Sequence, residues 1–302
     1  LIEEISSSAA PILIQGLENN NNIEIPNLNK IVDIDKKRLG IVLVDGLSAN
    51  IAGFLSKLYQ KSGSTVKYIG GGAGTMDFIQ KPVLFCRKGI FKNAALIAFV
   101  DVSSHLSVKH GWVEFKGPFV ITKSNKNIIS NINWDAAFDV YKEALLPNDA
   151  KKINRDNFYD IAKGYPFGIY REQEEYIVRD PLLMDDNNDI ICVGEVPENT
   201  IIHILKGEKQ NLIEAAGTAA QEALSANKEV NKVMMVDCVS RKLFLKNDYK
   251  EELQTVYNFV KKKDSKINLF GVLSLGEISS LESGALEFFN KTTVIGAIND
   301  SK

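Results

Sequence analysis

A glycine-rich segment is the first feature of this sequence that could bind a ligand. Four of the five residues 70–74 are glycine, and they follow an apolar run that ends at Ile69. Glycine backbone adopts positive φ and lets a ligand approach closely, and consecutive N–H groups can hold a carboxylate or a phosphate. The segment lacks the Lys-Ser or Lys-Thr of a phosphate-binding loop, and Thr75 stands where the dinucleotide motif requires its third glycine. The pattern therefore gives little support to a nucleotide site, and a tight turn between a strand and a loop is the alternative to an anion site.

Charged residues at the ends of apolar runs are the second such feature. Arg179 and Arg241 each follow an apolar run, and Glu277 follows a third. An arginine can pair with a carboxylate through two hydrogen bonds, and a glutamate can receive an ammonium group. Together they suit a small zwitterion, with a structural ion-pair network between the two halves of the chain as the alternative.

Neither the histidines nor the cysteines form a catalytic or metal-binding pattern. The three histidines are too few for a zinc site, although a single one, His110, could be an axial ligand of haem. Cys238 ends an apolar run, where a thiol is buried rather than reactive, so a hydrolase or transferase with Cys238 as nucleophile is an alternative only. No G-x-S-x-G motif is present. We therefore expect no catalytic activity, no metal and no resident cofactor.

The composition sets the class of protein. The 302 residues are 45% hydrophobic and 25% charged, as in a globular protein, and the formal net charge of −2 gives no sign of a nucleic-acid or anionic-membrane partner. No apolar run approaches the ~18 residues of a membrane-spanning helix, and the start at Leu1 shows no signal-peptide pattern. Three widely spaced cysteines fit a reducing cytoplasm better than a disulfide framework.

Apolar runs and turn residues predict the elements that must position these residues. A helix is expected from Ile51 with Ser48 as its cap, and a β-hairpin of 83–86 with 94–100 around Lys88-Gly89. Further helices are expected at 134–146, from 211 and at 249–260. The other expected strands are 41–44, 66–69, 112–115, 119–122, 176–179, 190–193, 201–205, 233–236, 269–273 and 292–298. The polar run 19–22 is expected to be an exposed loop.

A weak internal repeat relates the two halves of the chain. Residues 42–48 and 234–240 both carry an apolar strand that ends in Val-Asp-x-x-Ser and leads into a helix. Duplication of a β-α-β-β unit predicts a mixed α+β fold, in which two related mixed sheets share a cleft. The polar stretch 150–165 suggests a boundary between residues 1–150, of which 1–39 look like an atypical or truncated start, and residues 151–302. The loops after Val44, Ile69, Val236 and Leu273 should then converge on one ligand site, made by Asp45, Gly71, Gly72, Arg179, Cys238, Arg241 and Glu277.

Several short motifs resemble those of FIST domain proteins, which have an N-terminal FIST part and a C-terminal FIST_C part. Residues 175–182 resemble the family's VRD strand, and 194–199 its ipeG turn, with Asn199 where glycine is usual. Asparagine tolerates the same positive φ. Residues 238–241 are similar to the C-x-x-R motif, 270–278 to Gf-x-x-x-GEi and 289–293 to hN-x-T. The resemblance covers about residues 39–298.

The resemblance implies a cytoplasmic sensory module of signal transduction. Such a module binds a small molecule, such as an amino acid, and passes the signal to an output partner. The motifs include no output domain, so the partner would be a separate protein, such as a histidine kinase or a cyclic-nucleotide enzyme. The family also offers an alternative, a haem-binding nitric-oxide sensor. A protein–protein scaffold is a further alternative, and it would show an exposed apolar patch and no closed pocket.

Overall fold

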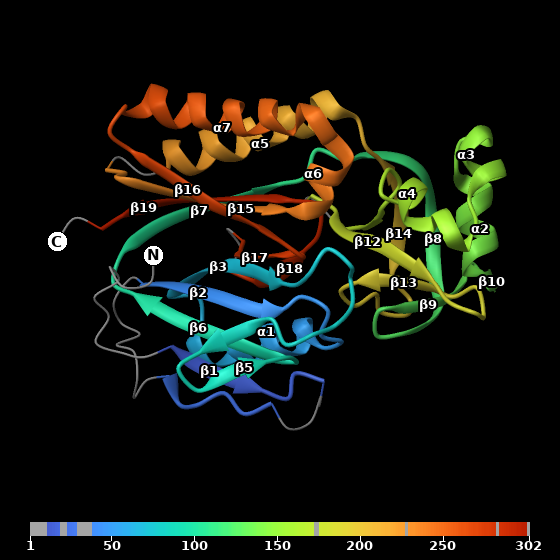
Figure 1. Cartoon of the computed structure of the whole chain (residues 1–302), viewed down its shortest axis with the longest axis horizontal. Helices are drawn as coiled ribbons and strands as arrows, with labels where there is room; N and C mark the ends of the chain where they lie inside the picture. Colours follow the sequence, from blue (N-terminus) through green and yellow to red (C-terminus); the bar gives the residue numbers. More distant parts are fainter. Residues whose placement is uncertain are drawn as a thin grey trace.

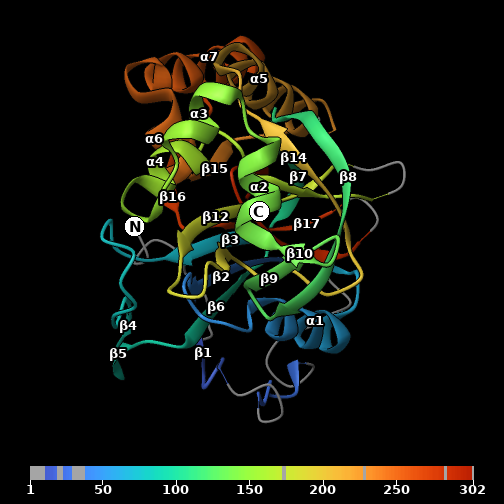
Figure 2. The ribbon, with the colours of Figure 1, turned by 90° about the vertical axis from the view of Figure 1, so that its right-hand side faces the viewer.

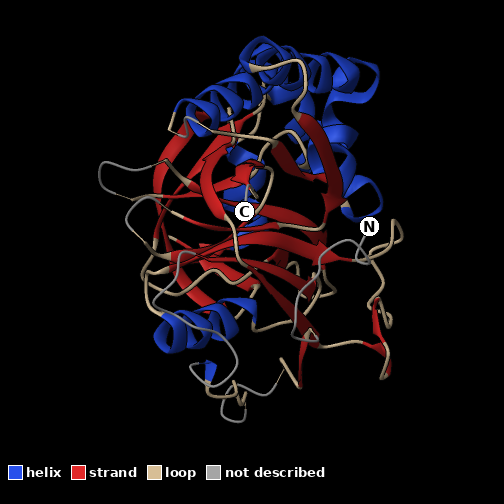
Figure 3. Cartoon of the chain, turned by 90° about the vertical axis from the view of Figure 1, so that its left-hand side faces the viewer, coloured by secondary structure: helices blue, strands red, loops and turns tan. Residues whose placement is uncertain are grey.

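Two β-sheets packed face to face, with helices on both outer sides, build the larger part of the molecule (Figure 1). The structure is a computed structural model, and it describes residues 11–18, 23–28, 38–171, 175–226, 229–281 and 284–300. The polar run 19–22 lies outside the described residues. Figure 3 shows the layers from the side, with helices above and below the strands.

The lower sheet has six strands in the order β1-β6-β2-β3-β17-β18. Of its neighbouring pairs, only β2 and β3 run parallel. Helix α1 (Ile51–Ser62) covers its outer face, because the buried Phe54 and Leu58 lie on one side of the helix and join the core with Val42 and Tyr68. The strands are β1 (Ile12–Gln15), β2 (Arg38–Asp45), β3 (Val66–Ala73), β6 (Ala94–Val100), β17 (Glu277–Ser280) and β18 (Leu286–Phe289).

The upper sheet has four strands in the order β16-β15-β19-β7. Helices α5 (Lys209–Ser225) and α7 (Tyr249–Lys263) cover its outer face. Alanines at 216, 219, 220 and 223 let α5 lie close to the sheet. The strands are β7 (Ser103–Lys109), β15 (Lys232–Cys238), β16 (Asn268–Ser274) and β19 (Thr293–Asn299). A separate apolar cluster, which includes Ile69 and Val236, joins the inner faces of the two sheets.

A third sheet closes on itself beside these layers (Figure 2). Strand β8 (Val113–Asn125) pairs with both β14 (Ile201–Lys206) and β9 (Ile128–Ile132), which completes a ring of six strands. The other members are β11 (Phe167–Ile169), β12 (Ile177–Met184) and β13 (Ile190–Val193), and the short β10 (Asp135–Ala136) pairs antiparallel with β9. Helices α2 (Ala137–Ala144), α3 (Pro147–Lys152) and α4 (Phe158–Ala162) lie beside it, with the short 3-10 helix η2 (Arg155–Asn157) before α4.

The two halves of the chain are related and exchange strands. The order β6-β2-β3 in the lower sheet is repeated as β19-β15-β16 in the upper one, with the same strand directions, so the mixed α+β fold with two related halves is confirmed. Strands β17 and β18 from the second half complete the lower sheet, whereas β7 from the first half lies at the edge of the upper one. The halves therefore interlock, because each completes the sheet of the other.

Some predicted elements differ in the structure. The expected hairpin of 83–86 with 94–100 is wrong. β4 (Leu84–Cys86) pairs with β5 (Gly89–Phe91) instead, and β6 pairs with β1 and β2, which are distant from it in the sequence. Ser48 does not cap α1, since its hydroxyl donates to Asn93 Oδ1 and Asn50 precedes the helix. The two strands expected at 112–115 and 119–122 form one long strand, β8.

Candidate functional site

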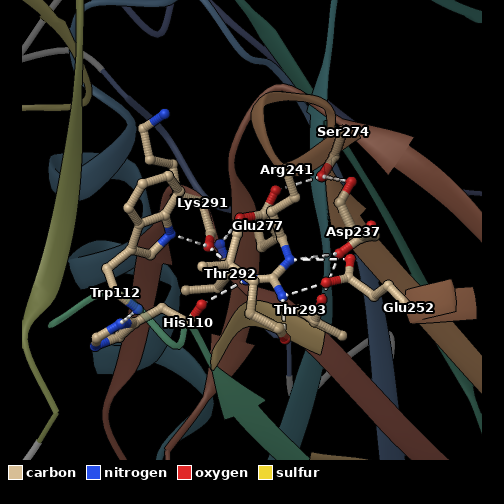
Figure 4. Close-up of polar contacts among 11 residues, drawn as sticks. His110, Trp112, Asp237, Arg241, Glu252, Ser274, Glu277, Lys291, Thr292 and Thr293 are labelled. Atoms are coloured by element: carbon tan, nitrogen blue, oxygen red, sulfur yellow. Dashed lines mark hydrogen bonds and ion pairs between the residues drawn. The ribbon is translucent and has the colours of Figure 1, made fainter. Parts of the chain in front are cut away.

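Arg241 lies at the centre of a buried polar network where the two halves meet (Figure 4). It belongs to the short helix α6 (Val239–Leu245), which begins directly after β15. Its Nη1 donates to the carbonyl oxygens of His110 and Lys291 at 2.6 and 3.0 Å. Its Nη2 donates to Leu212 O at 2.8 Å and to Glu252 Oε2 at 2.5 Å, and its Nε donates to Glu252 Oε1 at 3.2 Å. All five N–H groups of a guanidinium are thus bonded within the protein.

Two buried carboxyl groups lie near this arginine. Asp237 is the second-last residue of β15. One of its carboxyl oxygens lies 3.4 Å from Arg241 Nε and accepts a hydrogen bond from the Thr293 hydroxyl. Glu277 accepts from the Ser274 hydroxyl at 2.7 Å and from the hydroxyl and N–H of Thr292 at 2.8 and 3.1 Å. Burial raises the pKa of both groups, that of Glu277 to about 8. Burial thus favours the protonated form of Glu277.

Lys291 and Asp180 form a second pair in the same network. Lys291 is fully buried, its Nζ lies 3.0 Å from Asp180 Oδ1 and 4.8 Å from the centre of the Trp112 ring. Ser240 donates to the other oxygen of Asp180, and the Tyr159 hydroxyl lies 2.9 Å from Ser240 Oγ. The pair joins β12 of the closed sheet to α6 and to the turn before β19. We call the residues of these three paragraphs the seam network.

A small cavity adjoins the seam network, and we call it the seam cavity. Its volume of about 10 Å³ has room for about one water molecule. Asn290 is 1% exposed, and its Oδ1 has no hydrogen-bond partner among the described residues, while its Nδ2 donates to Phe289 O. The residues that line the cavity include Phe78, Asp180, Cys238, Ser240, Leu275 and Asn290.

Phe78 covers one side of the seam cavity. It lies in the segment 74–83 between β3 and β4, and its ring packs against Tyr159 with centres 5.4 Å apart. Its φ of +54° is a strained conformation for a bulky side chain. Gln80 from the same segment donates to Asp45 Oδ2 at 2.9 Å, and Asp45 also accepts from Asn93 N at 2.8 Å. Through the bond to Gln80, Asp45 helps to hold in place the segment that positions Phe78 over the cavity.

The glycine segment does not form the expected loop. Gly70 to Gly72 lie inside β3, paired with β2 on one side and β17 on the other. Gly72 N donates to Gly276 O and Gly72 O accepts from Leu275 N, both at 2.8 Å. A Cβ atom at Gly72 would lie 2.2 Å from Leu275 O, so the close approach of the second-half backbone requires glycine there. The expectation of free N–H groups for an anion, or of a tight turn, is therefore wrong.

The structure brings most of the predicted site residues together. Gly71 lies opposite Glu277 in the paired strands β3 and β17, and Cys238 lies beside Ser274 in β15 and β16. Arg179 lies apart from Arg241: it donates to Glu195 O at 2.8 Å and to Phe288 O at 2.9 Å. The expectation that both arginines meet one anion does not fit this arrangement, because each guanidinium is bonded to the protein's own groups. Whether the other residues bind a ligand remains a prediction.

The alternatives based on His110 and Cys238 find no support in the geometry. His110 accepts from Trp112 N at 2.9 Å, its Nε2 lies 3.6 Å from Glu175 Oε2, and it is not among the residues that line the seam cavity. The residues at His110 therefore do not fit a haem. Burial lowers the pKa of His110 to about 4 and raises that of the Cys238 thiol well above its ordinary value, which disfavours the reactive thiolate.

Several residues of the site were not predicted. Asp180, Asn290 and Lys291 lie inside motifs that carried the family resemblance, so those motifs were the available signal. No local sequence signal marked Phe78, Trp112, Tyr159 and Glu252, because their partners are distant in the sequence.

In the described parts of the chain, no three His, Cys, Asp or Glu side chains are grouped to hold a metal ion. None of the helices among those residues is long and apolar enough to cross a membrane.

Comparison with protein families shows which family this chain belongs to. A family model of the FIST N domain matches residues 2–135, and a model of the FIST C domain matches residues 137–280. The chain belongs to the FIST family. FIST domains are sensory domains of signal transduction. A comparison with curated proteins finds no match.

Both FIST domains contribute to the seam network. His110 and Trp112 come from the matched FIST N segment, and Asp180, Arg241 and Glu277 come from the matched FIST C segment. Lys291 follows the matched range, yet it is bonded to residues of both. Asn199 has a φ of +61°, so asparagine adopts the positive φ that was expected at the position where glycine is usual in the family. The network is thus a joint product of the two FIST domains.

Proposed function

We propose that this FIST protein binds a small molecule at the seam cavity and that the segment carrying Phe78 reports the binding. The observation that carries the proposal is the unpartnered Oδ1 of Asn290, which belongs to a buried side chain lining this cavity. A buried acceptor without a donor costs about 1–3 kcal/mol. A ligand that donates a hydrogen bond there would recover this cost.

The chemistry of the cavity favours a small amine such as an amino acid. Asn290 supplies an amide oxygen without a donor, and Asp180, which is already paired with Lys291, supplies a carboxylate beside it; both attract an ammonium group. Leu182, Val193 and Leu275 supply apolar walls for an aliphatic side chain. These features support an amino acid with a short aliphatic side chain as the ligand class.

Binding requires that Phe78 moves. Ligand pockets typically have ~300–1,000 Å³, whereas the seam cavity has about 10 Å³. The strained φ of Phe78 and the lack of helix or strand in 74–83 make this segment the wall that moves at the smallest cost. The covered arrangement is then the unliganded state, and the ligand competes with the Phe78 ring for the cavity.

The same part of the chain offers a surface for the output partner. Met76 and Ile79 lie on either side of Phe78 and are 59% and 60% exposed, and Phe85 and Ile90 on the β4–β5 hairpin are also exposed. In Figure 2 this hairpin projects from the body of the molecule. A displaced Phe78 segment would change this apolar surface, which suits a separate signalling protein such as a histidine kinase or a cyclic-nucleotide enzyme. We propose no catalytic step, and the three free thiols fit a cytoplasmic location.

Calorimetric titration with the twenty amino acids tests the proposal. We expect the parent to bind at least one short aliphatic amino acid. Phe78→Ala should bind the same ligand several-fold more tightly, because the cost of displacing the ring is removed. Asn290→Leu should weaken binding more than tenfold, and Phe85→Ala on the exposed hairpin is the matched control. Failure of both the parent and folded Phe78→Ala to bind any of these ligands would refute the proposal.

A further inference from the structure

A second and larger cavity lies at the opposite end of the two sheets, and we call it the edge cavity. It adjoins the beginning of β3, the strand β7 and the C-terminal end of α5, whereas the seam cavity lies where β15 and β16 end. Its volume of about 510 Å³ is in the range of small-molecule sites. We propose that the edge cavity binds a phosphorylated monosaccharide, independently of the seam cavity.

The packing of the sheets explains why this space exists. Ile69 of β3 joins the apolar cluster between the sheets, and Lys67 lies two residues earlier on the same face of the strand. The long polar side chain of Lys67 thus stands where the apolar contact between the sheets ends. Glu222, Ala223 and Ala226, at the end of α5, form the opposite wall.

The charges that line the edge cavity favour an anion. Lys67 forms no ion pair with any residue that the structure describes, and Arg38 has one partner, the exposed Asp101, at 2.8 Å. Glu222 is the acidic residue among the lining residues, and it is already bonded to Ser107 at 2.7 Å and to Lys109 at 3.2 Å. An incoming phosphate would therefore meet Lys67 and Arg38 without an unpaired carboxylate beside them.

The other polar groups favour hydroxyls on the same ligand. β7 is the last strand in the order of the upper sheet, so alternate residues of its outer side direct backbone N–H and C=O groups away from the sheet. Among the described lining residues, His105 is the one with an aromatic ring, which leaves a nucleotide base little to stack on. A sugar, in contrast, can exchange hydrogen bonds with the hydroxyls of Ser64, Ser103 and Ser104 in the wall.

Titration of the full chain with glucose 6-phosphate and ribose 5-phosphate tests this inference. Separate titrations with glucose and with inorganic phosphate measure how tightly the sugar and the phosphate bind on their own. We expect one of the sugar phosphates to bind at least tenfold more tightly than glucose or inorganic phosphate. Lys67→Gln should weaken this binding at least tenfold, and Ser104→Tyr should abolish it by filling the space. Lys61→Gln, an exposed lysine of α1, is the matched control, and thermal melting verifies that each variant is folded.

Three outcomes would overturn the inference. These are no binding of either sugar phosphate, equal binding of inorganic phosphate alone, and unchanged binding in folded Lys67→Gln. Phe78→Ala should leave sugar-phosphate binding unchanged, so a failure here is distinguishable from a failure of the seam-cavity proposal.

Discussion

Replacement of Arg241 by methionine should destabilise the protein by about 3–5 kcal/mol, the usual cost of removing one partner of a buried ion pair. Methionine keeps much of the side-chain length but has no charge and no donor. It would leave the fully buried Glu252 without its cation and remove the donors to three carbonyl oxygens, those of His110, Lys291 and Leu212. Because all five N–H groups serve the fold, the expected effect is on stability before any effect on a ligand.

The size of the effect can be measured by thermal unfolding. With ~2 cal/mol/K of unfolding entropy per residue, a loss of 3–5 kcal/mol lowers the melting temperature of a chain of this length by about 5–8 °C. The matched control is Arg155→Met, since Arg155 pairs with Asp186 at the surface and should cost less than ~1 kcal/mol.

A double variant separates the ion pair from lost packing. Arg241→Met with Glu252→Gln should recover part of the loss, because the uncompensated buried charge is gone. The reasoning is refuted if Arg241→Met costs no more than Arg155→Met, or if the second substitution adds its own full cost.

Three further predictions follow from burial and backbone conformation. Because the pKa of Glu277 is raised from 4.5 to about 8, the folded state keeps a proton that the unfolded chain releases, so stability should fall as the pH rises from about 5 to 8. Urea unfolding at both pH values should show a smaller fall for Glu277→Gln, and an equal fall would contradict the assignment. Iodoacetamide should modify the partly exposed Cys86 in the folded protein but Cys192 and Cys238 only after unfolding, and mass spectrometry that finds rapid modification of Cys238 would instead favour the nucleophile alternative. Asn199→Gly should leave the melting temperature nearly unchanged, whereas Asn199→Val should cost about 1–2 kcal/mol at this positive φ; equal melting temperatures for the two variants would argue against it.

The sequence alone predicted the elements whose signal is local. The apolar run at 233–236 lies within β15, because a buried strand needs a continuous apolar stretch wherever its partners come from. The run at 269–273 lies within β16, although that strand is at the edge of its sheet and is largely exposed. The match between residues 42–48 and 234–240 indicated the related halves, since each segment follows the central strand of its half towards a helix, which begins after a five-residue loop in the first half and at once in the second. The family resemblance indicated the positive φ of Asn199, because it placed this residue where glycine is usual and asparagine tolerates the same φ.

The tertiary structure decided how these elements combine. The pattern around Gly70–Gly72 was compatible with a loop, and the pairing with β2 on one side and with β17, about 200 residues later, on the other makes it a strand. Arg241 looked like a ligand-binding residue because its type and position suit an anion, but its partners come from β7's end, α5, α7 and the turn before β19. Phe78 has no local signal, since its role depends on Tyr159 and the seam cavity. Local pattern reports which residues are buried, whereas the pairing of distant strands fixes which buried groups meet, and that pairing depends on contacts that no short stretch of sequence contains.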